Sequence, residues 1–400
     1  MVAVTGIGIV SPHGDDPDRM FAALLRGESA VRPVFPELAR PAAAATVAFD
    51  ESRWFTKLQL AGVDRVSQLA VGAASLAVDD AGGLGAAPER VGVYVGCGMG
   101  GAGALEAAYA SGLRGGRVPP LTVPAFMPNA PAAHVAMRHS VHGPVLTYSV
   151  ACASSAVALA EAARAVRRGD VDVAIAGGAE ALIVPGVVSA WQALQTLASF
   201  AEGQAATACK PFAAHRNGFV LGEGAAFLVL ESTEGARRRG VRVHAELAGS
   251  GLTCDATHLT KPDSAGQQRA LRAALADAGL DPSEVGYCNA HGTATQIGDV
   301  VECDGLRAVW GDACDRLWVS STKALHGHLL GAAGALEAVV TILALREQRL
   351  PPNAHCDSPD PQCAVRLVLQ RHQAADGVSA AVSSSFAFGG TNAVLAFRRT

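Results

Sequence analysis

Four hundred residues, half of them hydrophobic and 17% charged, can build two packed units or one large α/β domain. The formal net charge is −4 and no dense block of Lys and Arg occurs, so we expect no nucleic-acid partner. The sequence contains no uncharged apolar run of about 18 residues. We therefore also expect no membrane-spanning segment.

The cysteine pattern favours a reducing compartment. Nine cysteines are scattered along the chain, an odd number, and none forms a C-x-x-C pair. This pattern argues against a disulfide framework and against a zinc site. The N-terminus also lacks a basic region followed by a long apolar stretch, as a secretion signal would have. We expect a soluble, cytoplasmic protein without a bound metal.

Short β-branched runs alternate with alanine-rich helical stretches along the whole chain. In the first half we expect strands at 2–10 and 171–180, a strand that ends in a glycine loop at 90–101, and helices over 66–82 and 154–168. In the second half we expect strands at 244–252 and 317–323, a strand followed by a loop at 284–293, a strand, loop and strand at 379–399, and helices over 267–280 and 334–348. Such alternation indicates α/β architecture. Because the two halves share one cadence and meet near residue 240, we expect an internal duplication.

The segment GCGMGG, residues 96–101, matches G-x-G-x-x-G and follows an expected strand. A dinucleotide site would also need an acidic residue about 20 positions further on. Residues 107–160 contain no Asp or Glu. We therefore interpret the segment as a tight loop packed against another part of the backbone.

Cys152 lies in TYSVACASSAVALAEAARAVRRGD, between an expected strand and an expected helix. The free N–H groups and the positive dipole of a helix N-terminus stabilise a thiolate there, and they could also bind an oxyanion. Taken alone, a cysteine among small apolar residues is more often simply buried. Its role depends on what else the chain brings to the same place.

Two histidines follow later strands in loops rich in small residues. His291 lies in NAHGTATQIGD and His328 in SSTKALHGHLLGAAGALE. One cysteine and two histidines at strand ends are typical of a convergent catalytic site. Lys323 and Glu337 flank His328 and form either a buried pair or a surface ion pair of little energetic value.

The last motif is SSSFAFGGTN, residues 383–392, with Phe386 and Phe388 beside two glycines. The rings could form a hinged apolar flap, because glycines let the backbone approach a ligand closely. Packing of both rings in the core is the alternative.

The motifs ACASS, NAHGTATQIGD, STKALHGHLLGAAGALE and SFAFGGTN, in this order, resemble those of the elongating β-ketoacyl-ACP synthases of the thiolase superfamily. The resemblance spans essentially the whole chain. It implies the five-layered αβαβα thiolase fold with duplicated halves, here 1–240 with the nucleophile and 241–400 with the histidine pair. It also implies a homodimer, or a heterodimer with a chain-length-factor-like sister chain. Initiating synthases carry Asn where this chain has His328, and thiolases would carry a second catalytic cysteine.

The resemblance also implies the reaction and the residues that perform it. Cys152 would accept the acyl group from acyl-ACP, with the backbone N–H groups of Cys152 and Phe388 as oxyanion hole. His291 and His328 would promote decarboxylation of malonyl-ACP, with Lys323 bonded to Glu337 beside them. The carbanion then attacks the acyl thioester and gives β-ketoacyl-ACP and CO2. No bound cofactor is implied beyond the phosphopantetheine arm of the carrier protein, which Thr293 and Thr295 would bind.

Several positions depart from the common family pattern. Trp191 and Met99 fall where the acyl tunnel usually has a smaller aromatic residue and an Ile, so we assign both to the acyl pocket with Phe386 and Phe388. Ala387 replaces a Gly of the gate, and the segment 210–225 lacks the acids that usually flank its Arg. These departures suit either fatty-acid elongation or a specialised type II polyketide route.

Two other classes compete with this assignment. A non-condensing scaffold or partner subunit would not need Cys152, which this chain keeps. A Cys-His hydrolase would need neither the second histidine nor the lysine. For the carrier protein, whose docking helix is acidic, the candidate basic contacts are Arg65, Arg114 and Arg117.

Overall fold

The computed structural model describes residues 1–369 and 371–400, and eleven strands of this part form one large mixed sheet. The strand order is β13-β11-β10-β15-β16-β9-β1-β8-β6-β4-β5. Its strands are β1 (Val2–Val10), β4 (Val91–Gly96), β5 (Val145–Tyr148), β6 (Val173–Glu180), β8 (Gly224–Ser232), β9 (Ala245–Cys254), β10 (Val285–Asn289), β11 (Trp318–Ser320), β13 (Arg366–Leu367), β15 (Ala380–Phe386) and β16 (Thr391–Arg398). The smaller sheets contain β2 (Arg32–Val34), β3 (Ala42–Ala45), β7 (Leu221–Gly222), β12 (Arg349–Leu350) and β14 (Gln373–Ala374).

The large sheet consists of two halves with the same topology. From the junction outward the first half runs β1-β8-β6-β4-β5 and the second runs β9-β16-β15-β10-β11. With β13 left aside, each half has five strands. In both halves the second strand along the chain (β4 or β10) pairs in parallel with the third (β5 or β11) and with the fourth (β6 or β15). The fifth strand (β8 or β16) pairs antiparallel with the fourth and with the first (β1 or β9). The halves join through β1 and β9. The duplication expected from the cadence of the sequence is therefore present in the topology.

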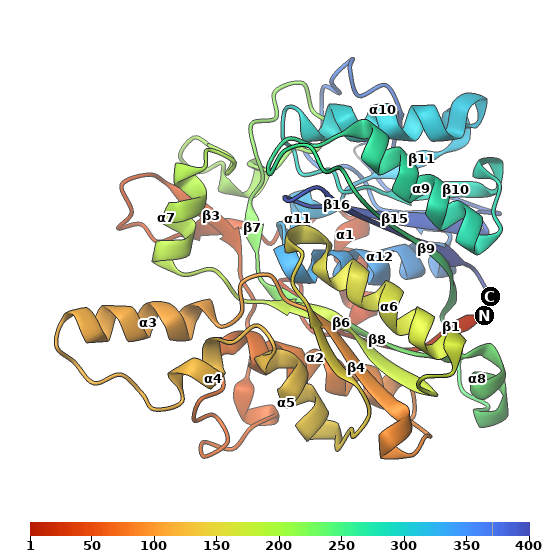
Figure 1. Ribbon diagram of the computed structural model, residues 1–400. Coiled ribbons are helices and arrows are strands. Elements are labelled where there is room, and N and C mark those ends of the chain that lie inside the picture. The colour runs from red at the N-terminus through yellow and green to blue at the C-terminus, as the bar shows by residue number, and fades with distance from the viewer. Residues whose placement is uncertain (370) are drawn as a thin grey trace.

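Helices complete five layers, as Figure 1 shows. Helices α2 and α5 cover the outer face of the first half, and α9 and α10 cover the outer face of the second. Helices α6 and α12 lie between the halves and pack against both of them. The helices are α1 (Pro17–Leu25), α2 (Arg65–Asp80), α3 (Ala102–Leu113), α4 (Thr122–Phe126), α5 (Ala130–His139), α6 (Ser154–Arg168), α7 (Pro185–Ala193), α8 (Thr233–Arg239), α9 (Ser264–Ala278), α10 (Gly298–Trp310), α11 (Lys323–His326) and α12 (Ala333–Glu347).

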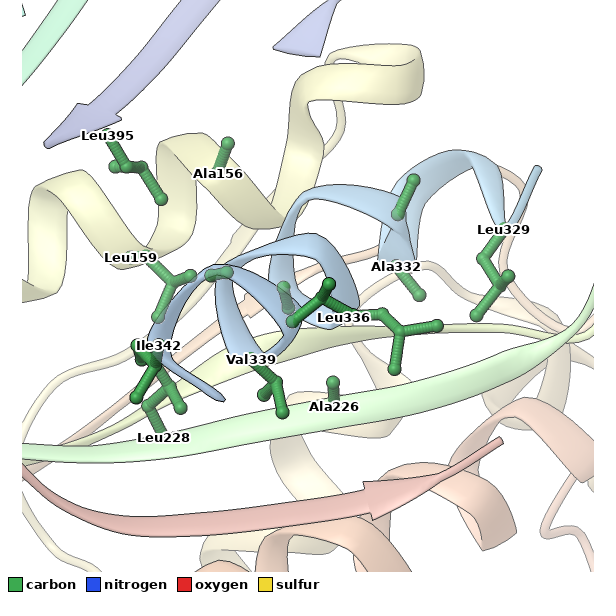
Figure 2. Packing of buried hydrophobic residues seen from close by; sticks show 14 of the residues in the cluster. Ala156, Leu159, Ala226, Leu228, Leu329, Ala332, Leu336, Val339, Ile342 and Leu395 are labelled. Atoms are coloured by element: carbon green, nitrogen blue, oxygen red, sulfur yellow. The ribbon is translucent and has the colours of Figure 1, made fainter. Parts of the chain in front are cut away.

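Helix α12 is the centre of the fold because it is buried on every side. All its residues from Ala333 to Leu345 are buried, as expected for a helix without a polar face. Figure 2 shows Leu336, Val339 and Ile342 of α12 beside strand β8. Leu159 of α6 lies near Ile342 in the same apolar cluster.

The parallel strands bring the candidate site residues to one region. Strands β4, β5 and β6 end at the same edge of the first half, as do β10, β11 and β15 in the second. Ligands in α/β proteins bind at the carboxyl ends of such strands. The loops after β5, β10, β11 and β15 carry the cysteine, the histidines and the phenylalanine gate.

The expected element bounds differ from the observed ones in a few places. Strand β11 ends at Ser320 and helix α11 already begins at Lys323, whereas the β-branched run predicted a strand through 323. The Ser321 N–H leaves the ladder and donates to Asn353 Oδ1, at 2.8 Å. Helix α7, which carries Trp191, was not among the predicted elements. None of the described helices is both long and apolar enough to cross a bilayer.

We expect Leu336→Ala to lower the free energy of unfolding by about 2–5 kcal/mol, because it leaves a cavity in a completely buried helix. Guanidinium unfolding followed by circular dichroism measures the change. Leu58→Ala is the matched control, since this side chain is 87% exposed. Equal effects of the two substitutions would contradict the central position of α12.

Candidate active site

Cys152 lies at a strained turn between β5 and α6. The preceding Ala151 has φ +48°, a left-handed conformation that is uncommon for a residue other than glycine. The Ser154 hydroxyl stabilises this turn by donating to the Ala151 carbonyl at 2.6 Å and accepting the Val150 N–H at 2.9 Å. The turn aims the thiol into a cavity at the N-terminus of α6, where Cys152 is only 6% exposed.

The two histidines converge on this thiol. His328 Nε2 lies 3.0 Å from Cys152 Sγ, and the His291 and His328 rings meet edge to face with centroids 5.5 Å apart. The donor atoms of the three side chains all lie within 4.8 Å of one another. The convergence of Cys152, His291 and His328 that the sequence suggested is thus present.

Backbone hydrogen bonds fix the histidine loops. The Glu302 carboxylate, from α10, accepts the N–H groups of His291 and Gly292, both at 2.8 Å. The His328 N–H donates to the Val220 carbonyl at 2.7 Å. Glu302 was not found from the sequence, although it follows His291 by only eleven positions, because a carboxylate that binds backbone N–H groups leaves no motif.

Lys323 and Glu337 form a completely buried ion pair, rather than a surface one. Burial lowers the pKa of His291 and of His328 well below the ordinary value, and the Lys323 charge lowers both further. Both imidazoles are therefore neutral at physiological pH. A neutral imidazole can donate one N–H and accept at its other nitrogen, as the proposed chemistry requires.

Burial has the largest influence on the protonation of the Cys152 thiol. Burial raises the pKa of Cys152 to about 12, although the Lys323 charge and the backbone N–H groups of Phe388 and Cys152 act in the opposite direction. The expected stabilisation at the helix N-terminus is present but smaller than the cost of desolvation. The resting group is a thiol, so its reaction needs a proton acceptor, and His328 Nε2 is in place.

The cavity beside the thiol has a volume of about 540 Å³. It is lined by Cys152, both histidines, Thr293, Thr295 and the aromatic residues Trp191, Phe219, Phe386 and Phe388, among others. This size and the mixture of apolar walls with a few polar groups are typical of small-molecule sites.

Aromatic contacts connect the wall of the cavity to the histidines. The Trp191 ring stacks on Phe388, with centroids 6.1 Å apart, and meets Phe219 edge to face at 5.6 Å. Phe219 in turn meets His328 edge to face at 5.4 Å, and Phe386 meets His291 at 6.1 Å. Phe219 was not among the residues identified from the sequence.

Met99 lies apart from this group. Its side chain is 43% exposed, and Met99 is not among the residues that line the cavity around Cys152. Its assignment to the acyl pocket therefore has no support within one copy of the chain and stays a prediction for an assembled dimer.

The segment 210–225 obtains its acids from elsewhere in the chain. Arg216 pairs with Asp360 at 2.7 Å and lies 3.7 Å from Asp299. It also donates to the carbonyls of Thr295 and Gln296, in the loop expected to bind pantetheine. The missing acidic neighbours in the local sequence are thus replaced by acids from α10 and from the loop near residue 360.

The cysteine and the two histidines also form a donor set that zinc could use. However, zinc-bound histidines usually donate their second ring nitrogen to an acceptor. Among the described residues, neither His291 Nδ1 nor His328 Nδ1 has such a partner. The adjacent Lys323 ammonium would also repel a cation, so the donor set suits a nucleophile better than a metal centre.

A buried cysteine at a helix N-terminus, in contact with a neutral histidine and beside a second one, on a duplicated five-layered fold, is the arrangement of an acyltransferase of the thiolase-fold class. Comparison with known families narrows this class to one family. The family model described as Beta-ketoacyl synthase, N-terminal domain, matches residues 1–236, and the corresponding C-terminal domain model matches residues 244–357. The chain belongs to the β-ketoacyl synthase family, whose members are condensing enzymes.

Individual relatives cover the whole chain. The 3-oxoacyl-[acyl-carrier-protein] synthase 2 of Staphylococcus aureus is 37% identical over 409 residues, with 100% of this chain and 98% of the relative covered. Nodulation protein E of Rhizobium meliloti is 40% identical over 407 residues, with 100% and 99% covered.

Solved structures agree with this membership. The ishigamide ketosynthase/chain length factor superimposes with a TM-score of 0.92 at 32% identity, covering 100% of this chain and 99% of that one. A β-ketoacyl synthase from Burkholderia phymatum gives 0.91 at 35% identity, with the same coverage. A type II polyketide ketosynthase, bound to a hexaketide in complex with its acyl-carrier protein, gives 0.91 at 28% identity, again with the same coverage. The thiolase fold expected from the resemblance is therefore confirmed.

We expect the rate of Cys152 alkylation by iodoacetamide to rise about tenfold per pH unit up to about pH 10, because only the thiolate reacts and burial raises the thiol pKa to about 12. Peptide mass spectrometry measures the rate at this cysteine. Lys323→Met removes the charge that lowers this pKa, so its curve should move to higher pH. Lys261→Met, which removes another cation lining the cavity, is the matched control. A plateau below about pH 9 in the unmodified protein would contradict this electrostatic picture.

Proposed function

We propose that this protein is a β-ketoacyl-ACP synthase that elongates an acyl chain by decarboxylative Claisen condensation. The observation that carries the proposal is the 3.0 Å contact of Cys152 Sγ with His328 Nε2, beside a second neutral histidine in a cavity of about 540 Å³. A hydrolase would have no use for this second histidine or for the buried Lys323. A scaffold subunit would not need the nucleophile.

The first step transfers the acyl group to Cys152. His328 Nε2 accepts the thiol proton as Sγ attacks the thioester carbonyl of acyl-ACP. The backbone N–H groups of Cys152 and Phe388 stabilise the oxyanion, and their influence on the Cys152 thiolate supports this role. Collapse of the intermediate breaks the bond to the carrier's sulfur, which regains the proton and leaves as a thiol.

The second step condenses the acyl group with malonyl-ACP. The malonyl carboxylate leaves as CO2, and the enolate oxygen that forms accepts N–H bonds from His291 and from His328, which for this step carries its one proton on Nε2, the nitrogen that faces Cys152. The enolate carbon attacks the acyl carbonyl, and the C–S bond to Cys152 breaks. The Cys152 thiolate that is released takes up one proton, which the overall reaction consumes from solvent, so the products are β-ketoacyl-ACP, CO2 and the free thiol.

Both substrates arrive on the phosphopantetheine arm of an acyl carrier protein. Thr293 and Thr295 line the cavity, with their hydroxyl oxygens 3.3 Å apart, and we assign them to the arm. Among the basic residues assigned to carrier docking, Arg114 and Arg117 are exposed. Arg65 is a weaker candidate because it already pairs with Glu223 at 2.7 Å.

We assign the pathway as fatty-acid or type II polyketide elongation, as the names of the relatives suggest. We also propose that the chain works as a homodimer or with a chain-length-factor-like partner, as one structural neighbour does. Strand β5 is an edge strand with Val145 39% and Leu146 45% exposed, and an unpaired apolar edge favours such pairing.

The same proposal divides the chain into halves at residues 240/241 and places it in the cytoplasm. Helix α8 ends at Arg239 and strand β9, which begins the second topological repeat, starts at Ala245. Nine free cysteines suit a reducing compartment.

Incubation with acyl-ACPs should add one acyl group to the intact protein, and Cys152→Ala should abolish the added mass. A panel of short saturated, long saturated, polyunsaturated and aryl acyl-ACPs, read by intact-protein mass spectrometry, makes the measurement. Cys254→Ala removes an exposed thiol instead and should load normally. CO2 release from malonyl-ACP completes the test. Loading that survives in Cys152→Ala, or absence of CO2 release by a loaded protein, would refute the proposal.

Trp191→Ala should shift acyl loading toward longer chains, because it removes an indole that fills the cavity between Phe219 and Phe388. Competition between acyl-ACPs of different length measures the shift. Trp318→Ala is the matched control, since this indole stacks with Arg366 outside the cavity. An unchanged length profile in Trp191→Ala would exclude the indole as a determinant of chain length.

A further inference from the structure

Glu180, the last residue of β6, is a buried carboxylate that the proposed chemistry does not use. Its Oε2 accepts the N–H groups of Gly98 and Gly331, both at 2.9 Å, and its Oε1 accepts the Met99 N–H at 3.1 Å. The side chain is 0% exposed. Three backbone donors around one carboxylate form an anion-binding nest, here filled by the protein itself.

The glycines of this nest are required by the close approach of backbone to carboxylate. A Cβ on Gly98 would lie 2.6 Å from Glu180 Oε2, and a Cβ on Gly331 would lie 2.6 Å from the same atom. The G-x-G-x-x-G segment at 96–101 thus surrounds an internal carboxylate rather than a nucleotide phosphate. The tight loop packed against another part of the backbone, expected from the sequence, is what the structure contains.

The three donors belong to two functionally different segments. Gly98 and Met99 lie in the loop after β4, where the acyl-pocket wall is assigned. Gly331 is the third residue after His328, in a segment where Leu330 has the left-handed φ of +43°. A single carboxylate therefore connects the Met99 loop to the segment that positions His328.

The ionisation of this carboxylate sets the strength of the three bonds. A neutral carboxyl group accepts N–H bonds more weakly than a carboxylate, and its new O–H donor would be surrounded by three N–H donors. Burial raises the pKa of Glu180 to about 7, against the backbone N–H groups that lower it, so protonation falls in the neutral range.

Few other charges face the carboxylate. The titratable side chain of the Gly loop is Cys97, which interacts with Glu180. Residues 329–336 carry no titratable side chain, and neither does Gly224, the β8 residue paired with Glu180.

We propose that Glu180 is a positioning residue whose ionised carboxylate holds the Met99 loop and the His328 segment in register, and thereby sets both the rate of acyl loading and the accepted chain length. This inference rests on the proposed synthase function. It assigns to Glu180 no contact with substrate. Its effect on loading would pass through His328, and its effect on chain length would pass through Met99, whose place in the acyl pocket is the prediction made above for an assembled dimer.

The test compares Glu180→Gln and Glu180→Asp with the unmodified protein in acyl loading of Cys152 from about pH 6 to about pH 8.5. We expect loading by the unmodified protein to slow as the pH falls through about 7. Glu180→Gln should load about tenfold more slowly at the upper end, lose this pH dependence and accept a broader range of chain lengths. Glu180→Asp, which keeps the charge, should keep the pH dependence and recover part of the rate. Glu231→Gln changes another buried acid, paired with Arg239, and should leave the pH profile and chain-length profile unchanged.

Two failures can be told apart. If the unmodified protein loads no acyl group on Cys152, the proposed function fails. If it loads but Glu180→Gln keeps the pH dependence and the chain-length profile, only the role of Glu180 is overturned. If Glu180→Gln does not fold, Glu180→Asp provides the test, because its shorter side chain cannot reach all three donors. A chain-length profile of Glu180→Asp identical to that of the unmodified protein would then overturn the proposed role of Glu180.

Discussion

The charge of the buried Lys323 ammonium acts on three other titratable groups of the candidate site, Cys152, His291 and His328. Its pairing with Glu337 stabilises the charge in an interior where electrostatic effects are screened far less than at the surface. Burial lowers the pKa of His291 and His328, and Lys323 lowers both further. Burial raises the pKa of Cys152, and Lys323 opposes this. Burial thus keeps the imidazoles neutral, the Lys323 charge adds to this effect, and the same charge makes the thiol easier to ionise.

Duplication explains how these groups reach one place, and it is the part of the molecule that the sequence predicted best. Strand-to-loop transitions marked by β-branched runs and small residues identified Cys152, His291, Lys323 and His328 before any contact was known. Because each half ends its parallel strands at one edge, residues after β5, β10 and β11 converge although up to 176 positions separate them. The helix that the sequence predicts at 334–348 is α12, whose residues from Ala333 to Leu345 are all buried between the two halves.

What the sequence could not reveal depends on distances between segments and on burial. Glu180 and Glu302 bind backbone N–H groups, which every residue except proline offers, so no residue pattern marks them. The sequence indicates the helix N-terminus that stabilises a Cys152 thiolate, but it does not reveal the larger opposing cost of desolvation, because the extent of burial depends on the packing of distant segments. Trp191 was identified only through resemblance, since its helix α7 lacks a clear amphipathic pattern and has just one buried residue, Val188.

The aromatic contacts join substrate choice to catalysis. Trp191 stacks on Phe388, whose backbone N–H acts on Cys152, and it touches Phe219, whose ring lies against His328. Aromatic pairs of this geometry contribute about 0.5–1.5 kcal/mol each beyond the area they bury, enough to bias ring positions without locking them. In the proposed function, an acyl chain that displaces the indole would therefore also disturb the Phe388 N–H and the His328 ring. Chain-length selection would then act on the rate of the proposed reaction as well as on binding, because a chain that does not fit would misalign the groups that must react with it.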